Sequence, residues 1–132
     1  MNQSSEEQLE LIHIQYLINT ILLGALVFSF LFAYNAELKL KGQAPFWDDQ
    51  TVRNLTIAVR MSLLIGTLIS IYVNFTNVDR LIKNGAPKET IESAQVQAAA
   101  SVLGVVVAVL VLWAILHNPT NDIIIDIENP EL

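Results

Sequence analysis

Cysteine is absent from this 132-residue chain, so disulfide bonds cannot stabilise it. Charge is also scarce: 15% of the residues are charged, against about 25% in an average soluble domain. The shortage is concentrated in residues 11–36, 55–76 and 94–117, where Arg60 is the only charged side chain. A proton pathway through a membrane needs acidic or histidine side chains at depth. The lack of acidic residues in these three stretches therefore argues against such a pathway.

The motifs that carry chemistry are missing as well. No catalytic, metal-binding or nucleotide-binding motif stands out in the sequence. The two histidines, His13 and His117, are expected on opposite sides of a membrane, so they cannot bind one metal ion together. The formal net charge is −6, which has the wrong sign for a nucleic-acid partner. We therefore expect no enzymatic activity, no cofactor, no metal and no nucleic-acid binding.

The three uncharged stretches are what the sequence does contain. Each can cross the hydrocarbon core of a membrane, which takes about 20 residues of α-helix. The first stretch is preceded by acidic residues instead of the basic ones of a signal peptide, so we expect it to be retained. We predict an all-α integral membrane protein with three transmembrane helices. Residues 1–118 would form a single domain, with residues 1–8 outside the first helix, and residues 119–132 an acidic tail.

Turn and cap signals set the ends of the second and third helices. Asp48 or Asp49 can cap the start of the second helix with a side-chain oxygen. Gly85 suits its end, and Pro87 suits the first turn of the third helix. Each of these helices would be about 45 Å long, beyond the roughly 30 Å of the membrane core. We therefore expect a long hairpin whose tip projects into water, and we expect the aromatic residues within 45–47 at the lipid headgroups.

Small residues recur at every fourth position of all three predicted helices. A four-residue step keeps side chains on one face of a helix, and small faces let membrane helices approach closely. We therefore expect helix–helix contacts along these small-residue stripes, either within one chain or between chains. The stripes are Ala25, Ser29 and Ala33 on the first helix, Ala58, Ser62, Gly66, Ser70 and Asn74 on the second, and Ala100, Gly104 and Ala108 on the third.

The hairpin should also bring polar side chains together. A turn centred just after Gly85 places polar residues of the second and third helices opposite one another at matched depths. The two pairs are Asn74 with Gln97 and Ser70 with Ser101. Hydrogen bonds of this kind stabilise membrane helices by about 0.6 kcal/mol each, so they would serve mainly to set the register. The alternative interpretation is a polar lining for a solute path.

Arg60 is the one charge inside a predicted span. Arginine at the centre of a bilayer costs roughly 2.5–3.5 kcal/mol on insertion scales. Its side chain can reach back toward the headgroups near the start of the second helix. The alternative is a buried pair with one of three residues at the end of the first helix, namely Tyr34, Asn35 or Glu37.

The acidic tail contains four isoleucines between Ile123 and Ile127. Isoleucine favours an extended backbone, and an extended apolar segment can add to the edge of a sheet in a partner protein. We therefore hypothesise a docking strand for a protein partner. The alternative is a chain end that binds nothing.

Several of these features together give the chain a resemblance to a group of known proteins. They are Tyr34-Asn35 closing the first helix, Arg60 early in the second, and Gln97 with Ala100-Ser101 in the third. Between residues 32 and 112 the chain thereby resembles a set of small bacterial three-helix membrane proteins that have no assigned activity. The resemblance implies the same architecture in the bacterial cytoplasmic membrane, and it implies no activity.

The functional prediction follows from architecture. We expect a small integral membrane scaffold or accessory subunit that acts through helix–helix association in a membrane complex. Its partners would be the lipid bilayer and either further copies of the chain or a larger complex. The alternative is a self-assembling pore or channel of the holin type, although holins usually end in a basic tail and this tail is acidic.

Overall fold

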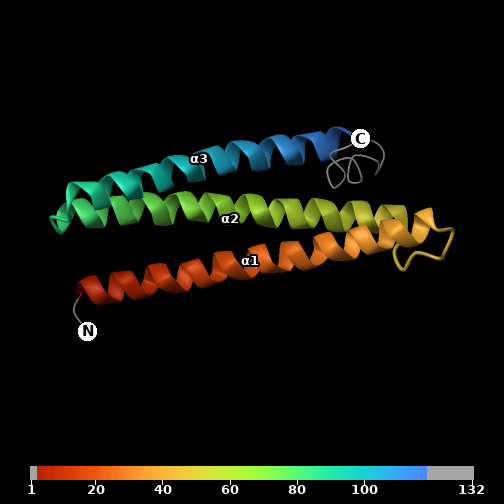
Figure 1. Ribbon diagram of the computed structural model, residues 1–132, viewed down its shortest axis with the longest axis horizontal. Helices are drawn as coiled ribbons and strands as arrows, with labels where there is room; N and C mark the ends of the chain where they lie inside the picture. The colour runs from red at the N-terminus through yellow and green to blue at the C-terminus, as the bar shows by residue number, and fades with distance from the viewer. Residues whose placement is uncertain (1–2, 119–132) are drawn as a thin grey trace.

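The fold consists of three long antiparallel helices. The structure, a computed structural model, describes residues 3–118, which form α1 (Gln3–Leu40), α2 (Asp49–Lys83) and α3 (Lys88–His117) and contain no strand. All three helices are long and apolar enough to cross a membrane, which confirms the predicted all-α fold with three transmembrane helices. Figure 1 shows α2 between α1 and α3. The predicted docking strand at Ile123–Ile127 lies outside the described residues.

The first helix is longer at both ends than the stretch 11–36 on which it was predicted. It starts at Gln3, so the expectation that residues 1–8 lie outside the helix is wrong for residues 3–8. Glutamate is a good helix former, and acidic side chains near a helix N-terminus interact favourably with its dipole. At the other end, Gly42 has a φ of 72° and ends the helix in a left-handed cap.

The second and third helices form the expected hairpin. Gly85 has a φ of 69°, and the backbone N–H of Ala86 donates to the carbonyl of Leu81 at 3.0 Å, which confirms the predicted cap. Pro87 is the N-cap of α3, one position before the first turn in which we expected it. The helices have 35 and 30 residues. At an α-helical rise of about 1.5 Å per residue, they exceed the roughly 30 Å membrane core, so the hairpin projects beyond it.

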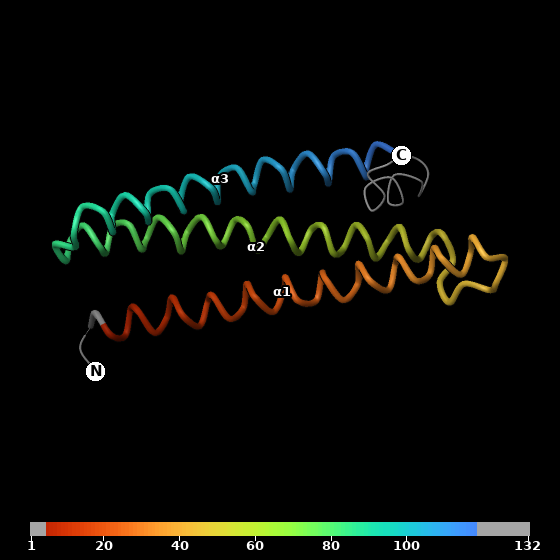
Figure 2. Tube along the Cα trace, in the orientation of Figure 1, coloured from red at the N-terminus to blue at the C-terminus, as the bar shows by residue number. Residues whose placement is uncertain are grey.

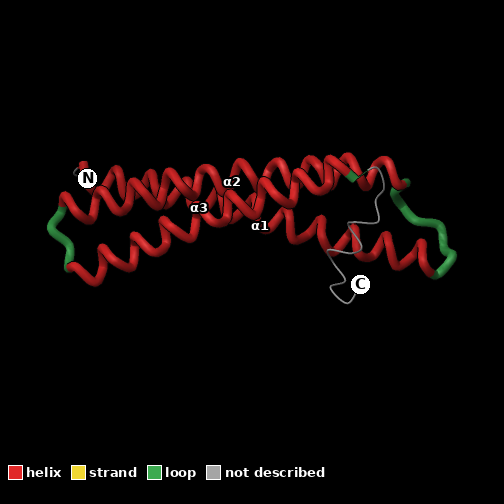
Figure 3. Tube along the Cα trace, turned by 90° about the horizontal axis from the view of Figure 1, so that it is seen from above, coloured by secondary structure: helices red, strands yellow, loops and turns green. Residues whose placement is uncertain are grey.

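The start of α2 is capped as predicted. Asp48 is the N-cap, and its Oδ1 accepts a hydrogen bond of 2.7 Å from the backbone N–H of Thr51. An ion pair also joins the end of α1 to the start of α2, with Nζ of Lys39 2.6 Å from Oδ1 of Asp49. Figure 3 shows the two connections at opposite ends of the bundle.

The buried faces of the outer helices follow alternating steps of three and four residues. This is the spacing with which helices pack at shallow crossing angles. In α1 the buried and half-buried positions of this seam are Leu11, Ile14, Ile18, Ile21, Ala25, Phe28, Phe32 and Asn35. In α3 they are Ile91, Ala94, Ala98, Ser101, Val105, Ala108, Leu112 and Ile115.

The bundle is open. Contacts of α2 with α3 are more extensive than those with α1, and α1 hardly contacts α3 within the described chain. Figure 2 shows α1 diverging from α2 toward its N-terminus. Only 11% of the most apolar stretch of each helix is buried within the chain. Most apolar side chains are therefore available to lipid or to other membrane helices.

Candidate functional site

A clamp built on Asn35 holds the connection between α1 and α2 against α1. Asn35 is only 4% exposed. Its Oδ1 accepts a hydrogen bond of 3.0 Å from the backbone N–H of Trp47, and its Nδ2 donates to the carbonyl of the same residue at 3.2 Å. Because one amide pairs with both backbone groups of Trp47, it anchors the loop to α1 at this point.

Aromatic rings complete this clamp. The Trp47 ring stacks on Phe28 with centroids 6.3 Å apart and meets Phe32 at 5.8 Å. The Phe46 ring makes a T-shaped contact with the Trp47 ring, with centroids 4.8 Å apart, and stacks on the Tyr34 ring, with centroids 5.9 Å apart. Aromatic pairs of this geometry contribute beyond their buried area. Side chains of the loop therefore pack on α1, while their depth relative to the headgroups stays a prediction.

The structure does not join Arg60 to the partners proposed for it. Asn35 is engaged with Trp47, and Glu37 accepts a hydrogen bond from Lys41 one turn further along. That hydrogen bond, together with the charge of the carboxylate, raises the pKa of Lys41 above its ordinary value. Within residues 3–118 no hydrogen bond or ion pair connects Arg60 with Tyr34, Asn35 or Glu37.

The small-residue stripes are split between buried and exposed positions. Gly66 is buried against α1, where an added Cβ would lie 3.6 Å from the Ile21 side chain, and Gly104 faces Thr67 of α2 at 4.0 Å. The other half-buried members are Ala25, Ser70, Asn74 and Ala108. The exposed members are Ser29, Ala33, Ala58, Ser62 and Ala100.

The cause of this split is geometric. A strict four-residue step advances by about 40° around the helix each time, so the stripe drifts off the contact line. The small residues of α3 that are buried are instead Ala94 and Ala98, at 6% and 2% exposure. Sequence reasoning missed them, although the alternating three-and-four spacing was there to be found.

The two polar pairs of the hairpin do not form the expected hydrogen bonds between helices. The hydroxyl of Ser70 donates to the carbonyl of Gly66 at 3.0 Å, and that of Ser101 donates to the carbonyl of Ala98 at 2.6 Å. Each serine thus bonds within its own helix, as serine in membrane helices often does. For Asn74 and Gln97 no hydrogen bond to each other is formed within the described chain, and Gln97 is exposed.

A contact that the sequence did not predict fixes the other end of the hairpin. The Arg53 guanidinium donates to the carbonyl of Asn118 at 2.7 Å and to that of Leu116 at 3.5 Å. A cation at a helix C-terminus compensates carbonyls that have no partner in the helix. The antiparallel register, which places residue 53 opposite residue 118, was the available signal.

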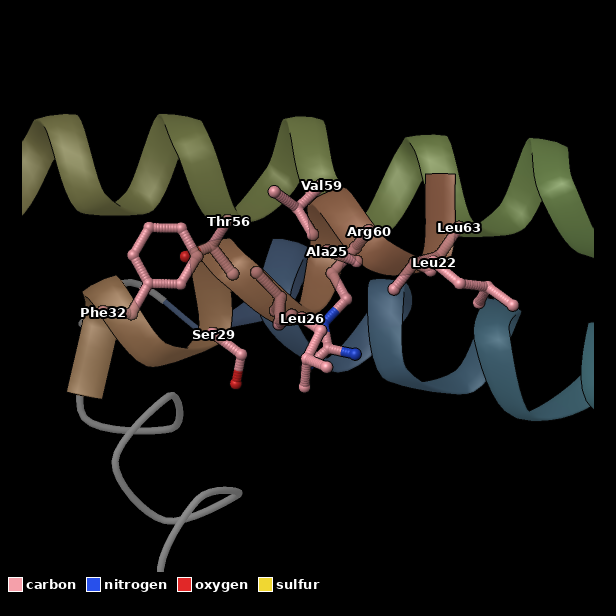
Figure 4. Close-up of a pocket in the computed structure, with 10 residues that line it drawn as sticks. Leu22, Ala25, Leu26, Ser29, Phe32, Thr56, Val59, Arg60 and Leu63 are labelled. Atoms are coloured by element: carbon pink, nitrogen blue, oxygen red, sulfur yellow. The ribbon is translucent and has the colours of Figure 1, made fainter. Parts of the chain in front are cut away.

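Two cavities lie on either side of the line along which α1 and α2 meet. The first, of about 260 Å³, contains Arg60 and is shown in Figure 4. Its lining residues are Leu22, Ala25, Leu26, Ser29 and Phe32 of α1, Thr56, Val59, Arg60 and Leu63 of α2, and Ile115 of α3. The second, of about 270 Å³, is lined by Thr20, Ile21, Gly24, Ala25 and Phe28 of α1 and Leu55, Ala58, Val59 and Ser62 of α2. We call the first the Arg60 cavity and the second the small-residue groove.

The chemistry available to these sites is limited to packing, hydrogen bonding and one positive charge. Within residues 3–118 no three histidine or acidic side chains lie close enough together to hold a metal ion. In comparisons with known proteins, no family model, no curated protein and no solved structure matches this chain. The function is therefore argued from the two cavities and the exposed polar side chains.

Proposed function

We propose that this protein is a small integral membrane scaffold or accessory subunit, which acts through helix–helix association in the cytoplasmic membrane of a bacterium. The observation that carries the proposal is the small-residue groove. Apart from the adjoining part of its own helix, Gly24 has no atom within 4 Å of the position that a Cβ would take, and Ala58 and Ser62 are exposed. Membrane helices associate where small residues let backbones approach closely. The groove supplies such a place on the outside of the bundle.

Polar groups on α1 support the same proposal. Gln15 donates a hydrogen bond of 3.0 Å from Nε2 to Oδ1 of Asn19, and both residues are exposed on the helix surface. This bond leaves the side-chain carbonyl of Gln15 and the side-chain N–H groups of Asn19 available for hydrogen bonds to another helix. Lipid tails offer no hydrogen-bond partner, so polar groups within a span favour contact with another helix.

The groove can be blocked without disturbing the chain itself. In Gly24→Leu the new side chain enters the groove, where it meets open space, so the isolated chain should keep its thermal stability in detergent. Val27→Leu is the matched control, because Val27 is exposed and lines neither cavity. Tagged chains would be purified from membranes in mild detergent, with chemical cross-linking for self-association and mass spectrometry for other partners.

The proposal requires that the wild type and Val27→Leu retain a partner or a second copy and that Gly24→Leu loses it. A Gly24→Leu chain that keeps every partner of the wild type would contradict the proposal.

A self-assembling pore is the second candidate, and exposed amides favour it. Gln97 of α3 is exposed and lines a cavity with Asn77, close to the hairpin end of the bundle. Gln15 and Asn19 lie toward the same end, because α1 and α2 run antiparallel. Copies that associate through these amides could surround a polar path. Dye leakage from vesicles containing the purified protein separates the candidates, since a scaffold leaves the vesicles sealed.

A further inference from the structure

The Arg60 cavity carries a second, independent inference, because it lies on the opposite side of the α1–α2 contact line from the small-residue groove. Arg60 is half-buried and makes no hydrogen bond or ion pair within residues 3–118. The stretches 11–36, 55–76 and 94–117 contain no acidic residue, so residues 3–118 have no carboxylate at this depth to neutralise it. A guanidinium in an apolar environment needs an anion or water, and an anion that pairs with Arg60 comes from outside residues 3–118.

Two polar groups in the cavity can face one ligand. Figure 4 shows the Arg60 guanidinium and the Ser29 hydroxyl among the residues that line it. The hydroxyl of Thr56, a third polar lining group, already donates to the carbonyl of Val52 at 2.7 Å. Arginine presents a planar fork of N–H donors that matches phosphate and carboxylate oxygens. Arg60 and Ser29 are therefore the two lining side chains that can offer hydrogen-bond donors to an anion.

The remaining wall of the cavity is mostly apolar. Phe32 lies toward the end of the bundle that holds the α1–α2 connection, whereas Leu22 and Leu63 lie deeper in the span. At about 260 Å³ the cavity is slightly smaller than sites that enclose a whole drug-sized ligand, which measure roughly 300–1,000 Å³. It suits part of a long molecule whose remainder stays in the bilayer.

The cavity is also accessible from the bilayer. Because α1 and α3 hardly contact each other, no helix closes the cavity between them. Leu22 and Leu26, which line it, are 51% and 55% exposed. A ligand can therefore enter sideways from the lipid, and an apolar tail can remain in contact with these side chains.

We propose that the Arg60 cavity binds an anionic phospholipid of the surrounding membrane. Its headgroup phosphate contacts the Arg60 guanidinium and the Ser29 hydroxyl, and one acyl chain lies against Leu22, Leu26 and Leu63. Side chains of a helix lean toward its N-terminus, so Arg60 of α2 reaches toward the headgroups on the side of Asp49. Of the molecules that combine an anion with a long apolar tail, phospholipids are always present around a membrane protein.

The test measures lipid retention by native mass spectrometry of the full chain in detergent with added phosphatidylglycerol or phosphatidylcholine. We expect the wild type to retain phosphatidylglycerol roughly tenfold more than phosphatidylcholine, and Arg60→Gln to lose this preference. Lys83→Gln also removes one positive charge but lies at the exposed hairpin tip, so it should behave as the wild type. Equal retention of both lipids by the wild type, or an unchanged preference in Arg60→Gln, would overturn the proposal.

A second variant guards against misfolding. Ser29→Leu keeps Arg60, places a larger apolar side chain at an exposed position of the cavity, and should fold as the wild type. We expect it to lose phosphatidylglycerol retention while keeping the thermal stability measured without added lipid. Full retention by this variant would contradict the assignment to this cavity.

The source of the anion is decided in the native membrane. A photo-reactive amino acid at position 26, which lines the cavity, should form an adduct with the mass of a phospholipid. An adduct with the mass of a free fatty acid would overturn the phospholipid assignment. An adduct with another protein chain would show that an acidic group of a partner helix fills the cavity instead.

Discussion

The two interfaces of α2 differ in how they are held. Toward α3, a four-residue connection with Gly85 in a left-handed conformation fixes one end, Arg53 fixes the other, and small side chains let the helices pack closely between them. Toward α1, the Asn35 clamp and the aromatic cluster fix one end, while cavities border the contact further along. The hairpin of α2 and α3 is thus the more closely packed half of the molecule, and α1 borders the surfaces that are open to other molecules.

Overpacking the α2–α3 interface should have the largest effect. Ala98 is 2% exposed, so Ala98→Leu forces α3 away from α2 and should lower the free energy of unfolding by about 3 kcal/mol. Ala100→Leu is the control, because Ala100 is exposed two positions away. Reversible unfolding in mixed detergent micelles measures both. If Ala100→Leu were the more damaging substitution, the four-residue stripe and not the alternating seam would be the contact face.

Removing the Asn35 clamp at the end of α1 should have the second-largest effect on stability. Asn35→Ala leaves the backbone N–H and carbonyl of Trp47 without their partners in a part-buried position, which should cost about 2 kcal/mol. The loss should detach the loop and loosen α1 while the hairpin stays paired. Trp47 fluorescence, monitored during unfolding in a Trp113→Phe background, reports on the loop. In Gln43→Ala, an exposed position of the same loop, unfolding should match the wild type, and an equal loss in both variants would argue against the clamp.

Local signals account for the parts of the fold that the sequence predicted. The length of the uncharged stretches predicts the three spans, Gly85 predicts the hairpin turn, and Asp48 predicts the start of α2. Each of these features depends only on residues that are neighbours in the sequence. The start of α1 at Gln3 was missed because a polar segment was equated with an irregular one. Helix propensity extends a helix beyond the membrane whenever no breaker stops it.

The site was less accessible to sequence reasoning because its contacts are distant along the chain. The clamp joins Asn35 to Trp47 across a loop, and no periodic pattern marks such a pair. The Arg60 cavity needs side chains of all three helices in one place, whereas the sequence shows only that Arg60 is an isolated charge. The seam at Ala94 and Ala98, in contrast, could have been predicted from the sequence, because its positions follow alternating steps of three and four residues. The prediction considered only small residues at a constant four-residue step and therefore missed it.

Gly66 tests the weaker interface directly. An added Cβ would lie 3.6 Å from Ile21, which is ordinary contact, so Gly66→Ala should be tolerated. Gly66→Leu brings further atoms into the Ile21 side chain and should cost about 1–2 kcal/mol. Ile65→Leu, at an exposed neighbouring position, should be nearly silent. Thermal unfolding of these three variants tests whether α1 packs against the face of α2 that contains Gly66. Equal stability of all three would exclude this contact.

Removing the charge of Arg53, which contacts the C-terminal end of α3, should have a smaller effect on stability. Arg53→Gln removes the charge that compensates the carbonyls of Leu116 and Asn118, and such contacts contribute about 1 kcal/mol in a part-exposed position. The same substitution at Lys83 is the control, because Lys83 is exposed in the last turn of α2. Amide hydrogen exchange should show faster exchange in the last turn of α3 for Arg53→Gln only. Unchanged protection there would mean that the contact contributes nothing measurable.

The smallest effect concerns the pH dependence of the α1–α2 connection, through the cap of α2. Hydrogen bonds from the side chain and the backbone of Thr51 lower the pKa of Asp48 below its ordinary value of 3.8. A carboxylate whose pKa is lower in the folded state contributes stability above its ordinary pKa and loses it as the pH falls through the lowered value. The bundle should therefore lose this contribution only below about pH 4. Asp48→Asn keeps a good cap without a titrating group, so its stability should change less between pH 7 and pH 3. Because both chains carry the same remaining acids, the difference between their two pH profiles isolates Asp48, and parallel profiles would show that the cap does not depend on its charge.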